Sequence, residues 1–155
     1  MKKSIRLIDF EERHRVACAH VIHRLPDWFG IEASNQAYVA ALGRLPTFVL
    51  EDRGAVLGFI ALEQTSAAAV EIHVMAVVPN LHRAGIGRAM LSQAEGWVRS
   101  RTCSILHVKT LGASHPNPFY ARTRAFYEAL GFRPVFETAA FWGPENPTLV
   151  LVKFI

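Results

Sequence analysis

The sequence predicts an α/β fold, with a mixed central sheet and helices on both of its faces. The chain has 155 residues, close to the size of one domain, and 51% of them are hydrophobic, enough to fill one core. Strand-like and helix-like hydrophobic patterns follow one another in the order β-α-α-β-β-β-α-β-α-β-β. Because runs of consecutive strands do not occur in a purely doubly wound sheet, this order favours a mixed sheet. We expect a single domain over residues 1–155.

Three strands and two helices are predicted in the first half of the chain. Asp9, with Glu12 three residues later, is typical of a capping box that opens a helix. Gly43 and Pro46 would end the second helix, and the turn at residues 52–54 predicts a hairpin. The expected strands are Ser4–Ile8, Thr47–Glu51 and Ala55–Glu63, and the expected helices run from Asp9 to about Arg24 and from about Ser34 to Leu42.

Four strands and two helices are predicted in the second half. Apolar residues recur at helical spacing from Ile86 to Val98. Pro79 ends a β-rich run, and Gly131 is typical of a helix C-terminus. The expected strands are Val70–Val78, Ser104–Val108, Pro134–Thr138 and Leu149–Phe154, and the expected helices are Ile86–Val98 and Phe119–Leu130.

Positive charge is concentrated in one segment. The net charge is +4, yet residues 81–133 hold eight Lys or Arg against only Glu95 and Glu128. A local basic field favours an anionic partner such as a polyphosphate cofactor, and a solvated basic face is the alternative. No run of five basic residues occurs, so we expect no nucleic-acid partner.

The remaining composition predicts a cytoplasmic protein. Charged residues interrupt the most apolar stretch well short of about 20 residues, and no signal-peptide pattern follows the first lysines, so we expect no membrane association. Cys18 and Cys103 are far apart and form no CxxC motif, which indicates core or surface thiols in a reducing compartment. His20 and His23 stand three residues apart without a third ligand, so we expect no metal site.

The most informative motif is a glycine turn between a strand and an amphipathic helix, at residues 82–88. Helix N-termini carry unpaired N–H groups at the positive end of the helix dipole, and glycine lets an anion approach the backbone closely. The turn lacks the Gly-Lys-Ser/Thr of a Walker A loop, and Met90 stands where a dinucleotide fingerprint has its third glycine. A glycine-rich helix start without a ligand is the alternative.

Three motifs in this order resemble the GCN5-related N-acetyltransferase (GNAT) family. The sequence His82-x-x-Gly85-x-Gly87 is similar to the family's Gln/Arg-x-x-Gly-x-Gly/Ala, although His82 departs from Gln or Arg. The preceding strand, Glu71 to Pro79, and the segment Tyr127-Glu-Ala-Leu-Gly-Phe132, which resembles Tyr-x-x-x-Gly-Phe, stand in the expected places. The motifs cover about residues 70–132, and the order of elements fits across the whole chain.

The resemblance implies a sheet that splays into a V between the strands Val70–Val78 and Ser104–Val108, with acetyl-CoA as co-substrate in that cleft. Its pantetheine would pair with the strand backbone and its pyrophosphate with the amides of the turn. Tyr120 and Thr123 stand where the family often has Asn-x-x-Ala, so the usual asparagine contact must be absent or replaced. The implied cofactor-binding residues are Met75, Val77, His82, Arg83, Ala84, Gly85, Ile86, Gly87, Arg88, Tyr120 and Thr123.

Acetyl transfer to an amine needs a proton acceptor and a proton donor. By its place in the motif, Tyr127 resembles the acid near the thioester sulfur; packing on the sheet is the alternative. Glu71, eleven residues before His82, resembles the general base of the histone acetyltransferase branch. Strand alternation puts His73 on the same face as a second candidate base, and a solvated strand carboxylate is the alternative for Glu71.

The residues and the resemblance together predict an acetyl-CoA-dependent N-acetyltransferase that moves the acetyl group directly to a small-molecule or peptide amine. We expect a monomer or homodimer. A non-catalytic acyl-CoA-binding or regulatory module of the same fold is the alternative, and an unrelated nucleotide-binding protein is a third hypothesis. The retained Tyr127 and Glu71 favour the enzyme.

Overall fold

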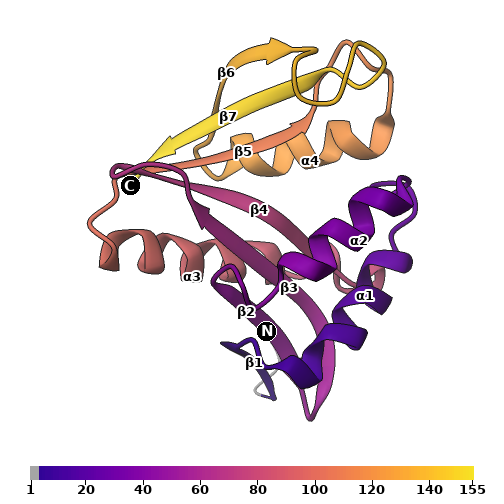
Figure 1. The fold of residues 1–155 in the computed structure, drawn as a ribbon, viewed down its shortest axis with the longest axis vertical. Helices are drawn as coiled ribbons and strands as arrows, with labels where there is room; N and C mark the ends of the chain where they lie inside the picture. Colours follow the sequence, from indigo (N-terminus) through magenta and orange to yellow (C-terminus); the bar gives the residue numbers. More distant parts are fainter. Residues whose placement is uncertain (1–3) are drawn as a thin grey trace. The chain divides into compact units, whose positions relative to one another are not determined.

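The computed structural model describes residues 4–155, and its elements follow the predicted order (Figure 1). The strands are β1 (Ile5–Asp9), β2 (Thr47–Asp52), β3 (Ala55–Gln64), β4 (Ala69–Val77), β5 (Ile105–Leu111), β6 (Arg133–Thr138) and β7 (Thr148–Phe154). The α-helices are α1 (Arg15–His23), α2 (Glu32–Ala41), α3 (Ile86–Ser100) and α4 (Pro118–Ala129), and two 3-10 turns are η1 (Glu12–His14) and η2 (Pro79–Leu81).

Seven strands form one sheet in the order β1-β2-β3-β4-β5-β7-β6. The pairs β1–β2, β2–β3, β5–β7 and β6–β7 are antiparallel. The N–H groups of Ser104 and Ile105, at the start of β5, both donate to the carbonyl of Ala68, just before β4. Because β4 and β5 therefore start at the same end, they run in the same direction, and the predicted mixed sheet is confirmed.

The chain forms two compact units. The first contains the described residues up to Glu63 together with Ile72–Trp97, and the second contains Gln64–Glu71 and Val98–Ile155. The boundary falls inside β4, between Glu71 and Ile72. The strand that carries the candidate proton acceptors therefore contributes to both units.

Helices cover both faces of the strands in the first unit. Figure 1 shows α1 and α2 on one side of these strands and α3 on the other. Residues 47–51 of β2 are buried without interruption, which is typical of a strand that is covered on both faces. One core cluster joins α1 to the sheet and consists of Cys18, Val21, Ile22, Leu25, Leu42, Val49, Phe59, Ala61, Val74, Ala76 and Val78.

The predicted start of the first helix is wrong. Asp9 is the last residue of β1 and pairs with Phe48 of β2. The capping box is formed two residues later, where the Glu11 N–H donates to His14 Nδ1 at 2.9 Å and the Glu11 side chain accepts from the His14 N–H. Sheet pairing extends the strand through Asp9, and a glutamate with a histidine replaces the expected Asp and Glu.

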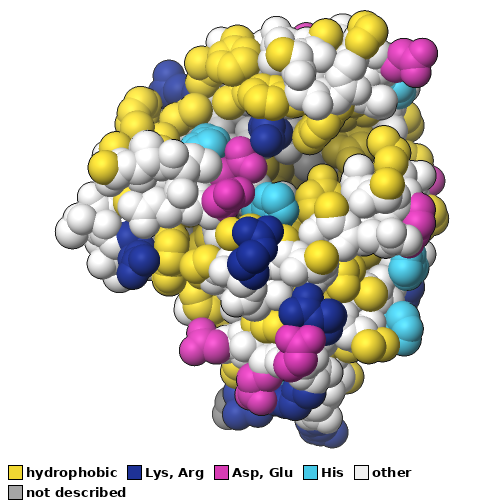
Figure 2. Space-filling model, in the orientation of Figure 1, with side chains coloured by type: hydrophobic (Ala, Val, Ile, Leu, Met, Phe, Trp, Pro, Cys, Tyr) yellow, Lys and Arg dark blue, Asp and Glu magenta, His cyan; other side chains and the backbone are white. Residues whose placement is uncertain are grey.

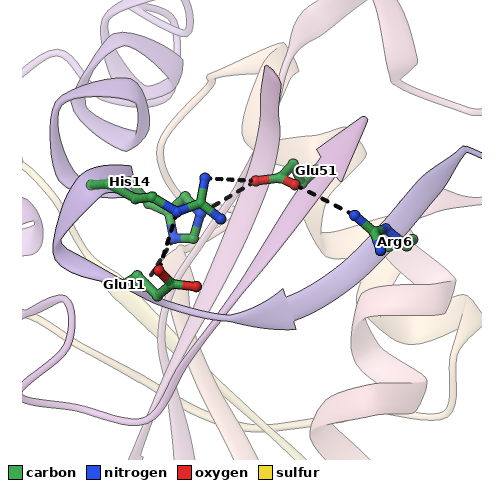
Figure 3. Close-up of polar contacts among 5 residues, drawn as sticks. Arg6, Glu11, His14 and Glu51 are labelled. Carbon is green, nitrogen blue, oxygen red and sulfur yellow. Dashed lines mark hydrogen bonds and ion pairs between the residues drawn. The ribbon is translucent and has the colours of Figure 1, made fainter. Parts of the chain in front are cut away.

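A buried carboxylate on β2 connects this capping box to the sheet (Figure 3). Glu51 is only 4% exposed, and its Oε2 lies 3.3 Å from His14 Nε2 and 3.3 Å from Arg13 Nη1. Arg6, which stands opposite Glu51 on β1, lies 3.8 Å from Oε1. A buried carboxylate needs such partners, because desolvation without them is costly.

The second unit places α4 against β5 and β6 (Figure 1). Asn117 caps α4, since its side chain accepts hydrogen bonds from the N–H groups of Phe119 and Tyr120. Hydrophobic side chains lie exposed over the β6–β7 part of the face shown in Figure 2. The exposed large hydrophobic residues of this unit include Val135, Phe136, Phe141 and Trp142.

Smaller differences from the predicted bounds concern element ends. Helix α2 starts at Glu32, two residues before the expected Ser34, and β5 continues to Leu111 rather than ending at Val108. Within residues 4–155, no helix combines the length and the apolar character that crossing a membrane requires.

Candidate functional site

The predicted glycine turn forms between η2 and α3 in the first unit. Residues 82–85 are a turn, and α3 begins at Ile86. Arg83 and Gly85 both have positive φ angles, 63° and 80°. A Cβ on Gly85 would meet no atom within 4 Å, so the glycine is needed for its backbone conformation rather than for space.

The N-terminus of α3 is open for an anion. The first backbone hydrogen bond of the helix runs from the Ala89 N–H to the Gly85 carbonyl. Among the described residues, no acceptor is found for the N–H groups of Ile86, Gly87 and Arg88. Because unpaired N–H groups at a helix start bind anions, the turn fits a phosphate group. Five residues of the turn are exposed: His82, Arg83, Ala84, Gly85 and Arg88.

His82 turns away from the open helix start. Its Nε2 lies 2.8 Å from the carbonyl oxygen of Val77, at the end of β4. Its ring packs edge-on against Trp28, with 5.5 Å between the centroids. The histidine therefore links the turn to the strand. The N–H groups of His82 and Ala84 donate to Pro79 and Leu81, so the N–H groups that remain for a ligand include those of Ile86, Gly87 and Arg88.

His73 and Met75 lie on β4 in the first unit, and both are partly exposed. His73 Nδ1 is 3.6 Å from Glu63 Oε2, and its ring packs edge-on against Tyr38. This candidate proton acceptor is thus partly accessible and has a carboxylate beside it. Val77, the other predicted pantetheine contact, is buried and shares its carbonyl with His82.

Glu71 lies in the second unit with two basic neighbours. Its Oε2 is 3.5 Å from Lys109 Nζ and 3.7 Å from His107 Nδ1, and its side chain is 11% exposed. The carboxylate has an ammonium and an imidazole beside it, because β5 lies next to β4 and contributes Lys109 and His107.

Tyr127 is buried near the end of α4, at 5% exposure. Its ring packs edge-on against Phe126 and Phe132. Burial raises the pKa of the Tyr127 phenol far above its usual value, with a smaller contribution from Tyr120. The phenol therefore keeps its proton at neutral pH, as a hydrogen-bond or proton donor must.

Comparisons with known proteins decide the family. Residues 44–134 match the family described as "Acetyltransferase (GNAT) domain", which is more than half of the chain. The chain belongs to the GNAT acetyltransferase family. Members of this family use acetyl-CoA. The predicted fold class and family resemblance are therefore confirmed.

Individual GNAT relatives differ in how much of this chain they resemble. Mycothiol acetyltransferase from Beutenbergia cavernae is 34% identical over 91 residues, which are 59% of this chain and 29% of the relative. The chain thus spans less than a third of that protein's length. Two solved structures share the fold. The ribosomal-protein-S18-alanine N-acetyltransferase from Escherichia coli has a TM-score of 0.78 and 19% sequence identity, and the match covers 97% of this chain and 94% of that one. A GNAT family acetyltransferase from Elizabethkingia anophelis with acetyl-CoA bound has a TM-score of 0.75 and 14% sequence identity, and the match covers 99% of this chain and 100% of that one.

The two positions where this GNAT chain lacks the usual asparagine motif lie on α4. Tyr120 is partly buried, and its N–H is held by the Asn117 cap. The Thr123 hydroxyl donates to the Phe119 carbonyl one turn earlier, at 3.3 Å. An asparagine does stand in this segment, but Asn117 is used to cap the helix.

Motif matching missed three residues around Glu71. These are Lys109 and His107, two residues apart on β5, and Thr65, whose Oγ1 lies 2.8 Å from His107 Nε2. The alternation of polar residues in β5 was a signal that this strand carries a polar face. It could not indicate that Glu71 lies opposite that face.

Proposed function

We propose that this GNAT protein is an N-acetyltransferase that moves an acetyl group directly from acetyl-CoA to an amine. The open N-terminus of α3, with three N–H groups available next to exposed Arg83 and Arg88, carries the proposal. The other two motifs support it, because a protonated Tyr127 and the Glu71 carboxylate supply the donor and acceptor that the reaction needs.

The amides of the turn would hold the pyrophosphate. Ile86, Gly87 and Arg88 would donate their N–H groups, and the side chains of Arg83 and Arg88 would add positive charge. Backbone groups of Met75 and Val77 would pair with the pantetheine, with His82 keeping its bond to the Val77 carbonyl.

The chemistry would require one proton acceptor and one donor. An alkylamine is roughly 99.9% protonated at pH 7, so its N–H bond must break before the nitrogen lone pair can attack. Glu71 would take that proton, with His73 as the second candidate. The nitrogen then forms a bond to the acetyl carbon, the C–S bond breaks, and Tyr127 gives its proton to the departing thiolate.

The acceptor would be a small-molecule or peptide amine, with the whole chain acting as one N-acetyltransferase domain. Within the second unit, the Phe141 ring covers the Lys109 ammonium beside Glu71, a mixed apolar and charged setting that suits an amine with an apolar portion. A screen of amines against acetyl-CoA with free-thiol detection tests the function. Amine-dependent thiol release supports it. Tight acetyl-CoA binding without release for any amine would favour the non-catalytic module instead.

A further inference from the structure

The Glu71 cluster of the second unit contains a histidine that the proposed reaction has not used. His107 is half-buried on β5, between Glu71 on one ring nitrogen and Thr65 on the other. This arrangement of carboxylate, imidazole and hydroxyl is also found where histidine moves protons in enzymes. All of these residues belong to the second unit.

Hydrogen bonding indicates which nitrogen of His107 carries the hydrogen. The Thr65 hydroxyl donates to the Ala69 carbonyl at 3.3 Å. That oxygen has a further lone pair, so His107 can donate its Nε2–H to Thr65 Oγ1 over the 2.8 Å contact. In this tautomer Nδ1 holds the lone pair, on the side of the ring that lies 3.7 Å from Glu71 Oε2.

The surroundings of His107 favour a neutral ring, which is the form that can accept a proton. Burial lowers the pKa of His107, Glu71 raises it by a smaller amount, and Lys109 lowers it. The residue paired with His107 on β7 is Val152, which carries no charge. Lys109 also compensates the Glu71 carboxylate, and the Phe141 ring covers the ammonium at 4.7 Å.

We propose that His107 is a positioning residue that shares, through its Nδ1, the proton that Glu71 accepts from the amine. This inference rests on the proposed function. The amine N–H bond breaks, its electron pair stays on nitrogen, and an O–H bond forms at Glu71 Oε2. That O–H donates to Nδ1, or transfers its proton there to leave a carboxylate beside an imidazolium. The 3.7 Å contact must shorten by about 0.7 Å to become a hydrogen bond.

The pH dependence of kcat/KM tests this role. His107→Gln should lower kcat/KM about tenfold or more at pH 7, with a smaller loss near pH 9, where more of the amine is already unprotonated. His23→Gln is the matched control, because His23 also faces a glutamate, Glu32, at 3.3 Å, but on the exposed surface of the first unit. It should leave the profile unchanged. A His107→Gln enzyme within about threefold of wild type at every pH would overturn the proposal.

Nitrogen-15 NMR of labelled histidine supplies a readout that needs no substrate. His107 should show the Nε2–H tautomer, and Thr65→Val should remove that preference whereas Thr65→Ser retains it. Lys109→Met should raise the His107 pKa, and Glu71→Gln should lower it. The low-pH limb of kcat/KM should move to higher pH in Lys109→Met, together with the NMR titration. An Nδ1–H tautomer would contradict the proposal. So would a low-pH limb of kcat/KM that stays in place when the pKa of His107 shifts.

The same measurements distinguish failure of the proposed function from failure of the His107 role. If the proposed function is wrong, the wild-type protein releases no thiol with any amine, while the tautomer and the titration shifts of His107 can still be measured. Failure of this inference alone leaves an active wild-type enzyme whose pH profile does not respond to His107 or Lys109.

Discussion

At the scale of single residues, the Tyr127 phenol combines deep burial with a retained proton. Tyr127→Phe removes only the hydroxyl, so turnover should fall by about tenfold or more while acetyl-CoA affinity stays nearly constant. Because burial raises its pKa, ionisation of Tyr127 should cause no loss of kcat below pH 10. Steady-state kinetics and acetyl-CoA titration check this. A loss below about threefold, with chemistry limiting turnover, would leave Tyr127 as a packing residue.

The two candidate bases, Glu71 and His73, lie in different units and can be ranked by substitution. Glu71→Gln keeps the shape and removes the proton acceptor, so kcat/KM should fall by about 10²-fold or more at pH 7. The loss should shrink as the pH approaches the pKa of the amine. His73→Ala should have the milder effect, and a reversed ranking would assign the proton to His73. Equal losses at every pH would instead indicate damaged binding or folding.

Cys18 is a core thiol, which decides between the two interpretations left open by the sequence. It is fully buried, and burial raises its pKa from 9.0 to about 12, although Arg15 acts in the opposite direction. Its thiolate fraction at pH 8 should be about a thousandfold lower than in the unfolded chain. Alkylation followed by peptide mass spectrometry should label Cys18 only after denaturation. Rapid labelling of the native protein would contradict the burial.

At the scale of elements, the turn before α3 depends on one left-handed glycine. Gly85→Ala places a Cβ at φ +80°, which costs about 1–2 kcal/mol although no atom blocks it. Because the turn must shift to relieve that strain, acetyl-CoA binding should weaken about tenfold. Gly54→Ala is the matched control, since Gly54 has φ +86°, equally open space, and a place in the β2–β3 turn. It should lower stability similarly and leave the affinity unchanged; equal weakening in both variants would argue against a phosphate site.

The first helix shows how neighbouring elements set each other's limits. Its 3-10 turn packs His14 onto Glu51, a residue 37 positions later on β2, at a shift in strand register between Leu50 and Glu51. The same carboxylate accepts a hydrogen bond from Arg13 of the turn and forms an ion pair with Arg6 of β1 (Figure 3). Strand β1 therefore extends through Asp9, and the helix begins after the residues that contact Glu51.

At the scale of the whole molecule, ligand binding should stabilise the fold. Acetyl-CoA at 100 times its Kd adds about 2.7 kcal/mol, which corresponds to a rise in Tm of about 5–11 °C for a chain of this size. Differential scanning fluorimetry should show this rise for acetyl-CoA and CoA, and less for ATP or NAD. If the chain is one domain as predicted, circular dichroism and fluorescence should report a single coincident transition. A larger shift with ATP, and none with CoA, would contradict the assignment of the turn.

Local sequence patterns determined the order of the elements, the glycine turn and the position of Tyr127 on its helix. Periodicity, capping residues and turn glycines act over a few neighbouring residues, so they can be recognised in the sequence. The family resemblance predicted acetyl-CoA as the cofactor. It could be recognised in the sequence because its three motifs are also local patterns. Element ends were less predictable, since pairing and packing extend or shorten them.

Only the tertiary structure decided the surroundings of the candidate base. Thr65 and His107 are 42 residues apart, yet their side chains meet at 2.8 Å. Lys109 reaches Glu71 because β5 pairs beside β4 after a helix of 15 residues has intervened. Strand alternation states which residues share a face, but it does not state which strand becomes the neighbour. The partners of Glu71 therefore follow from strand pairing between distant segments.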